Sequence, residues 1–158
     1  MNIFKHTDSL SLMSELKHDS VDLVLTDPPY IISKPSGFKH FKNGVERFAV
    51  STDHGAWDKQ DQFNLTDLRG SVSEYYRVLC KHGTAIIFCD LWKISYIKQI
   101  MEDVGFKQIR LIEWLKTNPV PLNSSRNYLT NAREIALLGV KVSKPTFHSK
   151  YDNGLYQF

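Results

Sequence analysis

The sequence has few cysteines: Cys80 and Cys89 are the only two among 158 residues, and they stand in separate contexts. With no Cys-x-x-Cys pair, neither a disulfide framework nor a zinc site is indicated. The six histidines show no metal-ligand spacing either. No apolar run approaches the roughly 20 residues of a membrane span, and the opening MNIFKHTDSL has no block typical of a signal peptide. We therefore expect a cytoplasmic protein without a metal site or a membrane-spanning segment.

Charge is also nearly balanced, because the formal net charge is only +3. The positive residues gather in two regions, 34–47 and 116–150. A mild, clustered excess that is mixed with aromatic residues is compatible with a polyanionic partner such as nucleic acid. An ordinary solvated surface explains the same charges, so composition alone leaves both alternatives open.

A chain of this length, with 42 % hydrophobic residues, can form one globular domain with its own core and is short for two. We expect a single catalytic domain over residues 1–158. Residues 32–64 are polar, with isolated aromatic side chains and many Lys, His, Gly and Asp residues. Such a long segment within a domain is usually functional or disordered, which predicts a mobile loop that serves as a lid or substrate arm.

Hydrophobic periodicity predicts strands alternating with helices. The predicted helices cover 9–19, 64–80 and 91–106, the last with Gly105 as its C-cap, and the predicted strands cover 21–27, 82–90, 107–117 and 131–142. This alternation favours an α/β fold built from βαβ units, with helices on both faces of the sheet. The two closing strands are candidates for an antiparallel pair at its edge.

The stretch VDLVLTDPPY has the residues of a binding site where a buried strand ends. In open α/β sheets, ligands bind beyond the carboxyl ends of the strands, and Asp27 stands at such an end. Pro28 and Pro29 fix the backbone and lack N–H groups, so they form a rigid platform of acceptors. Asp27 and the Pro28 carbonyl suit a group with two N–H bonds, such as an exocyclic amine, and Tyr30 offers a ring for stacking. The alternative is a plain turn that ends the strand.

VDLVLTDPPY also resembles the catalytic motif of the DNA amino-methyltransferases, which transfer a methyl group from S-adenosylmethionine (AdoMet) to N6 of adenine or N4 of cytosine. Further stretches are similar to the group in which the catalytic motif precedes the cofactor motif: FKHTDSLSLMSELKHDS before it, GAWD at 55–58, EYYRVLCKHGTAIIFCD at 74–90, IEWLKTNPVP at 112–121 and NAREIALLGVK at 131–141. The resemblance implies a Rossmann-like AdoMet-dependent methyltransferase fold in permuted order. It also implies a cytoplasmic enzyme of restriction–modification type that acts on double-stranded DNA.

The resemblance implies roles for individual residues. The implied catalytic residues are Asp27, Pro28, Pro29 and Tyr30, with Tyr30 stacking on a flipped-out base. The implied cofactor-binding residues are Asp8, Asp27, Phe88 and Asp90. The implied DNA-contacting residues are Tyr30, Lys34, Lys39, Trp114 and Lys116. Simpler roles remain for several of these: a helix N-cap for Asp8, core packing for Phe88, and an ordinary edge strand for Trp114 and Lys116. Asp at the first motif position favours adenine over cytosine. Both cysteines are expected to be core residues rather than nucleophiles.

The sequence departs from the family in one respect. The Phe-x-Gly-x-Gly cofactor loop is absent, since no two of the eight glycines lie within three residues of each other. We also expect the target-recognition region to be truncated from about residue 117. We expect an incomplete fold whose apolar surface and unpaired edges favour a homodimer or a complementing chain that supplies the loop. The predicted function is DNA adenine-N6 methylation. The alternatives are a silent DNA-binding or assembly fragment, a cytosine-N4 methyltransferase, and methylation of a non-DNA amine such as a protein amide.

Overall fold

The computed structural model describes residues 4–29, 65–119, 132–149 and 151–158. The chain divides into two compact units, one of Met1–Pro28 with Arg69–Phe158 and the other of Pro29–Leu68. The first unit contains the sheet. The second lies almost wholly outside the described residues, as do the predicted loop 32–64, Tyr30, Lys34 and Lys39. A single catalytic domain over the whole chain stays a prediction.

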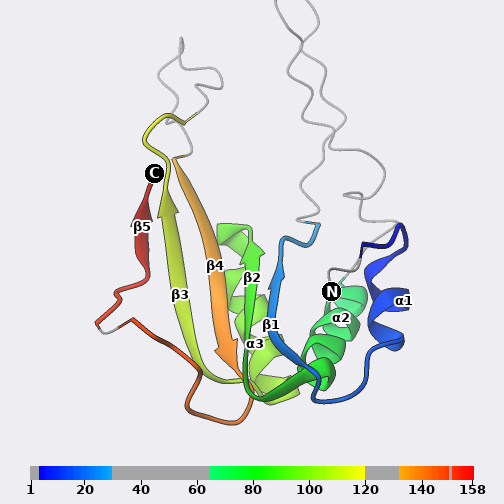
Figure 1. Cartoon of the computed structure of the whole chain (residues 1–158). Helices are drawn as coiled ribbons and strands as arrows, with labels where there is room; N and C mark the ends of the chain where they lie inside the picture. The colour runs from blue at the N-terminus through cyan, green and yellow to red at the C-terminus, as the bar shows by residue number, and fades with distance from the viewer. Residues whose placement is uncertain (1–3, 30–64, 120–131, 150) are drawn as a thin grey trace, which may run out of the picture. The chain divides into compact units, whose positions relative to one another are not determined.

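The sheet has five strands in the order β1-β2-β4-β3-β5 (Figure 1). Their bounds are β1 Val21–Thr26, β2 Leu79–Cys89, β3 Lys107–Leu115, β4 Arg133–Val140 and β5 Leu155–Gln157. β1 is parallel to β2, β5 is parallel to β3, and β4 is antiparallel to both of its neighbours. The predicted antiparallel pair is therefore confirmed as β3 and β4, but its predicted place at the edge is wrong, because β5 pairs with the outer side of β3. Because only β4 runs the other way, the carboxyl ends of the other four strands meet at one edge of the sheet.

The helices follow the predicted segments with shorter bounds. They are α1 Ser9–Ser14, α2 Leu65–Val78, the 3-10 turn η2 Leu91–Lys93, and α3 Ile94–Val104. α3 ends as predicted at Gly105, whose φ of 117° is left-handed and whose N–H donates to the carbonyls of Met101 and Glu102. The predicted helix over 9–19 stops at Ser14, so the last residues before β1 form turns instead.

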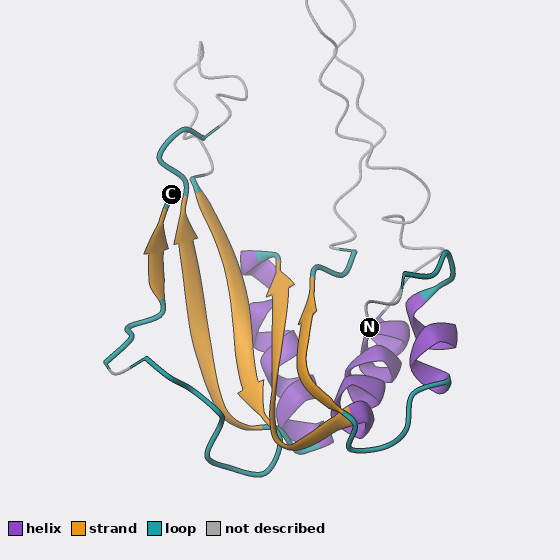
Figure 2. Ribbon diagram, viewed as in Figure 1, coloured by secondary structure: helices purple, strands orange, loops and turns teal. Residues whose placement is uncertain are grey.

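Both α2 and α3 pack on the same face of the sheet (Figure 2). On β2 this face carries Ala85, Ile87 and Cys89, which are at most 2 % exposed. Here α3 approaches β4 closely, since a Cβ at Gly139 would lie 2.5 Å from the methyl carbon of Met101. The prediction of helices on both faces is wrong for the described residues. Both crossovers step in the same direction along the sheet, and right-handed crossovers of that kind place their helices on one face.

Two cationic side chains hold together the segments that precede β1 in the sequence. The Arg77 guanidinium at the end of α2 donates to the carbonyls of Met13 at 2.7 Å and Leu16 at 3.0 Å, which ties α1 to α2. The Lys141 ammonium, one residue beyond β4, donates to the Leu79 carbonyl and to Asp19 Oδ1, each at 2.8 Å. These contacts fix the chain where it enters β1.

Candidate active site at the carboxyl edge of the sheet

Asp27 follows β1 directly at the carboxyl edge of the sheet. β1 is held in extended form by its parallel ladder to β2, in which Leu25 pairs with Ile86 and Thr26 with Ile87. Asp27 is exposed, and Pro28, which follows it, is half-buried. Pro29 is also half-buried. The predicted acceptor residue is thus accessible at the position where a ligand of this kind of sheet binds.

Phe88 and Asp90 lie at the end of β2, the strand beside β1. Phe88 pairs with Ala136 of β4 and lies on the sheet face opposite the helices. Asp90 is half-buried and is the N-cap of η2, because its Oδ1 accepts the Trp92 N–H at 3.2 Å. The fold therefore brings Asp27, Phe88 and Asp90 to adjacent strand ends, as the sequence predicted for a shared edge.

Asp8 lies on a helix terminus instead of a strand end. Its Oδ1 accepts the Ser11 N–H at 2.9 Å, which makes it the N-cap of α1. Hydrogen bonds from Ser11 lower the pKa of the Asp8 carboxyl below its ordinary value. The simpler of the two predicted roles is the one this geometry displays, and a cofactor contact by Asp8 stays a prediction.

Trp114 and Lys116 lie at the carboxyl end of β3, two strands away from β2. Trp114 is 37 % exposed, and the Lys116 ammonium lies 5.7 Å from the centroid of its indole ring. Lys116 also forms an ion pair with Glu134 of β4. The two side chains share the edge with Asp27, but the charge of Lys116 is already balanced by a carboxylate.

Further aromatic side chains lie along the same edge, and the sequence reasoning did not single them out. Trp92 follows the end of β2 and is 87 % exposed, with Leu91 and Tyr96 beside it at 57 % each. A tryptophan two residues after a strand-ending aspartate was the available signal. Tyr156 on β5 pairs with Trp114 on β3, and it could not be predicted because β5 has only three residues, all exposed.

The two cysteines lie in surroundings that raise the pKa of their thiols. Cys89 is buried on the helix-covered face, and its burial raises the pKa of its thiol to about 11. Cys80 is half-buried and its thiol donates to Asp22 Oδ1 at 3.1 Å, which also raises its pKa. A raised pKa disfavours the thiolate, which is the nucleophilic form of cysteine. The expectation of core placement is confirmed for Cys89 and holds only in part for Cys80.

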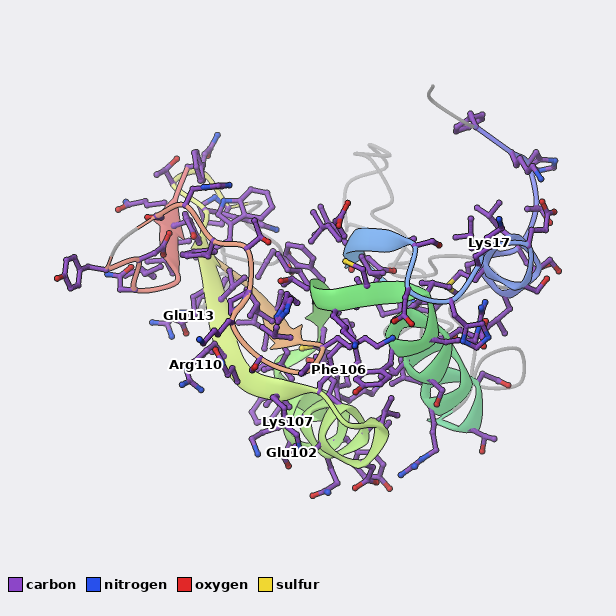
Figure 3. The ribbon with its side chains drawn as sticks, turned by 60° about the horizontal axis from the view of Figure 1, so that its bottom comes forward. Lys17, Glu102, Phe106, Lys107, Arg110 and Glu113 are labelled. Atoms are coloured by element: carbon purple, nitrogen blue, oxygen red, sulfur yellow. The ribbon has the colours of Figure 1, made fainter. Side chains whose placement is uncertain are left out.

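A separate hollow of about 380 Å³ lies at the amino end of β3 (Figure 3). It is lined by side chains from the junction of α3 and β3, namely Lys98, Glu102, Phe106, Lys107, Gln108, Ile109 and Arg110. Because β3 runs parallel to β1 within the sheet, this hollow lies at the edge opposite Asp27. Among the described residues there is no cluster of three or more potential metal ligands, and no helix is long and apolar enough to cross a membrane.

Comparison with known families gives a match over most of the chain. The DNA methylase family matches residues 21–156. The type II methyltransferase M2.DpnII of Streptococcus pneumoniae is 34 % identical over 152 residues, which cover 92 % of this chain and 53 % of that protein. M2.LlaDCHI of Lactococcus lactis subsp. cremoris is 33 % identical with the same coverage. The chain thus spans about half the length of these curated relatives.

Solved structures show the same fold. The cytosine-N4-specific PvuII DNA methyltransferase aligns with a TM-score of 0.66 and 16 % identity, over 96 % of this chain and 55 % of the other. The M1.HpyAVI–SAM complex aligns with a TM-score of 0.57 and 22 % identity, over 97 % of this chain and 65 % of the other. At these identities the likeness concerns the fold alone. It agrees with the predicted fold class.

Proposed function

The chain belongs to the DNA methylase family, and we propose that its carboxyl sheet edge is the base-binding half of a DNA adenine-N6 methyltransferase active site. The observation that carries the proposal is the position of Asp27. It is exposed, it follows a strand held by a parallel ladder, and it lies beside the strand end that carries Phe88 and Asp90. A plain turn would also leave Asp27 exposed, so the support comes from its position at the edge where ligands bind in such sheets.

The chemistry of this edge fits an exocyclic amine. The lone pair of adenine N6 is delocalised into the ring, which makes the nitrogen a poor nucleophile. Hydrogen bonds from the two N–H groups to the Asp27 carboxylate and the Pro28 carbonyl would draw the lone pair back onto nitrogen. Pro28 and Pro29 keep these acceptors rigid, so little reorganisation is needed when the amine reacts. Catalysis of this kind consists of positioning and electrostatics.

The target base must leave the DNA duplex to reach such an edge. Stacking on Tyr30 would offset part of the unstacking cost, and Lys34 and Lys39 would contact phosphates. These three residues lie outside the described residues. Trp114 and Lys116 are placed at the same edge, and we propose that they flank the bound DNA.

AdoMet supplies the methyl group when it is bound, and the residues present fit only one side of its site. Asp27, Phe88 and Asp90 offer carboxylates and an aromatic ring at the edge. The chain has no glycine pair that would let its backbone approach the methionine portion closely. The cofactor site is therefore proposed to be shared with residues that the curated relatives carry beyond the matched half.

Asp at the first motif position favours adenine, and cytosine N4 is the second candidate because it also presents an exocyclic amine. Methylation of a protein amide is less well supported, since a related family motif for amides begins with Asn. A silent DNA-binding fragment is the candidate from another class. One experiment separates the candidates that act on DNA.

The experiment incubates the chain with AdoMet and unmethylated DNA, with and without the part of M2.DpnII that lies outside the match. The DNA is then digested to nucleosides, and the methylated bases are identified by mass spectrometry. We expect N6-methyladenine, and we expect Asp27→Ala to reduce it by about 10²–10³-fold while DNA binding persists. Asp103→Ala, which removes a carboxylate of α3 that pairs with Arg69 and lies away from the proposed site, is the control. Detection of N4-methylcytosine would identify cytosine as the target base in place of adenine. DNA binding without any methylated base would support the silent DNA-binding fragment.

A further inference from the structure

An exposed tryptophan lies just beyond the end of β2. Trp92 is 87 % exposed, while Leu91 before it and Tyr96 in the first turn of α3 are each 57 % exposed. Tryptophan is highly buried on average, because its large ring gains much free energy on leaving water. Three large apolar side chains that are left in water within one short segment, at the edge that carries the proposed site, indicate a surface that a ligand covers.

Hydrogen bonds fix the turn that carries Trp92. Asp90 Oδ1 accepts the Trp92 N–H at 3.2 Å, and the Asp90 carbonyl accepts the Lys93 N–H at 2.9 Å. The Ile94 N–H donates to the Leu91 carbonyl, so η2 continues directly into α3. The indole ring itself has no aromatic or cation–π partner within the part of the chain that the structure describes. Trp92 therefore presents an open ring from a held backbone.

The position of Trp92 along the sheet edge is next to the proposed acceptor. The last pair of the β1–β2 ladder joins Thr26 to Ile87, and beyond it β1 leads directly to Asp27 while β2 leads to the turn of Trp92. In the other direction along the strand order β1-β2-β4-β3-β5, Trp114 lies at the carboxyl end of β3. Trp92 thus lies between the residue proposed to accept the amine and a residue proposed to flank the DNA.

We propose that Trp92 stacks its indole ring on a nucleobase that the departure of the target base leaves unstacked. This inference rests on the proposed function, since it places DNA at this edge. The open indole offers a flat face, and every base has a π-face on which such a ring can stack. The exposed carboxylate of Asp27, at the neighbouring strand end, repels phosphate groups, so a base is the better occupant than the DNA backbone.

Stacking by Trp92 offsets part of the cost of base flipping. When the target base leaves the duplex, it uncovers the faces of its neighbours. Apolar side chains that enter a base step repay part of such unstacking, and Leu91 adds a second exposed apolar side chain to the same turn. Because stacking between a base and an aromatic ring tolerates any sequence, Trp92 contributes affinity for the opened DNA and does not select the target sequence.

The test measures binding of the full chain to a mixed-sequence single-stranded oligonucleotide and to the paired duplex of the same sequence. The single strand offers unstacked bases without a flipping cost. Trp92→Leu keeps the apolar bulk but has no flat face, whereas Trp92→Phe keeps a ring, and neither should affect folding because Trp92 is exposed. Phe147→Ala is the control, since it removes another aromatic side chain, 55 % exposed, from the segment between β4 and β5.

The expected result separates stacking from charge. Trp92→Leu should bind the single strand about 10-fold more weakly than the wild type, while Trp92→Phe and the control should stay within about 3-fold of it. Binding to the paired duplex should change by less than about 2-fold in all variants, because it depends on phosphate contacts. The salt dependence of binding should also be unchanged, since no variant removes a charge.

Equal single-strand binding by the wild type and Trp92→Leu would overturn the inference. An equal loss for single strand and duplex, or a loss of AdoMet binding in place of DNA binding, would also overturn it. Methylated bases are measured in parallel, with the part of M2.DpnII outside the match added. Methylation without any dependence of DNA binding on Trp92 would keep the proposed function and reject the stacking. Single-strand binding that depends on Trp92, without any methylated base, would do the reverse. A folded chain that binds neither form of DNA would reject both.

Discussion

Replacement of Lys141 by methionine should show how strongly the segments around β1 are held together. The Lys141 side chain is 12 % exposed, and its ammonium donates to the Leu79 carbonyl and to Asp19 Oδ1, each at 2.8 Å. It also lies 4.9 Å from the centroid of the Tyr76 ring. Methionine keeps a side chain of similar length and removes the charge with these interactions and a longer one, at 3.4 Å, to the Arg77 carbonyl. The variant therefore isolates the ammonium group.

The expected loss follows from these contacts. A hydrogen bond from a charged donor to a buried carbonyl contributes about 1.5–3 kcal/mol, and a partly desolvated cation–π contact about 0.5–2 kcal/mol. Burial of the methionine side chain offsets part of this, so we expect the free energy of unfolding to fall by about 2–4 kcal/mol. Urea denaturation followed by circular dichroism measures it. Lys107→Met, which removes an exposed lysine at the start of β3, should change the value by less than about 0.5 kcal/mol.

The difference in unfolding free energy between the wild type and Lys141→Met should also depend on pH. The hydrogen bond from Lys141 lowers the pKa of the Asp19 carboxyl below its ordinary 3.8. A carboxyl with a lowered pKa stabilises the fold above its unfolded value and loses this effect as the pH falls through the folded value. The advantage of the wild type over Lys141→Met should therefore shrink below about pH 4. A loss of less than 1 kcal/mol at pH 7 with an unchanged m-value would refute the reasoning, because the ammonium would then exchange its contacts for water without cost.

Two further predictions concern backbone strain and thiol ionisation. Gly105→Ala should lower the free energy of unfolding by about 1–2 kcal/mol, since the φ of 117° is left-handed and the new Cβ would lie 3.3 Å from the Tyr76 ring. Gly70→Ala inside α2, where the new Cβ meets open space, should raise it by about 0.5–1 kcal/mol. Thermal unfolding of the two variants tests these opposite signs. Cys89 has its pKa raised from 9.0 to about 11, so the folded state loses stability as the pH rises from 9 to 11, by roughly 2–3 kcal/mol relative to Cys89→Ala. The same pH dependence of the unfolding free energy in the wild type and in Cys89→Ala would contradict the raised pKa of the Cys89 thiol.

Local sequence signals were sufficient for most elements of the sheet. The apolar runs of β1 and β2 and the glycine that ends α3 each have one physical interpretation, and the structure agrees with it. The bounds are less well defined by sequence. β2 begins at Leu79, directly after α2, although the expected start was His82, because the first residues of the strand are joined to β1 through an irregular register. β5 could not be predicted, since three exposed residues carry no periodicity.

The arrangement of helices around the sheet was beyond a sequence argument. Periodicity indicates that α2 and α3 are amphipathic, but it does not tell in which direction each crossover steps along the sheet. That direction decides the face on which a helix packs. For the site, alternation of strands and helices was enough to place Asp27 and Asp90 at one edge. The capping hydrogen bonds of Asp8 and Asp90 required coordinates, because a capping aspartate and a ligand-binding aspartate look the same in sequence.

β1 shows why agreement between levels of structure is informative. Its sequence is suited to burial on both faces and to pairing on both edges, yet the described sheet supplies one neighbour and one covered face. Disagreement of this kind marks functional or incomplete surfaces more often than it marks sequence noise. Here it falls on the strand whose next residue is the proposed acceptor of the target amine.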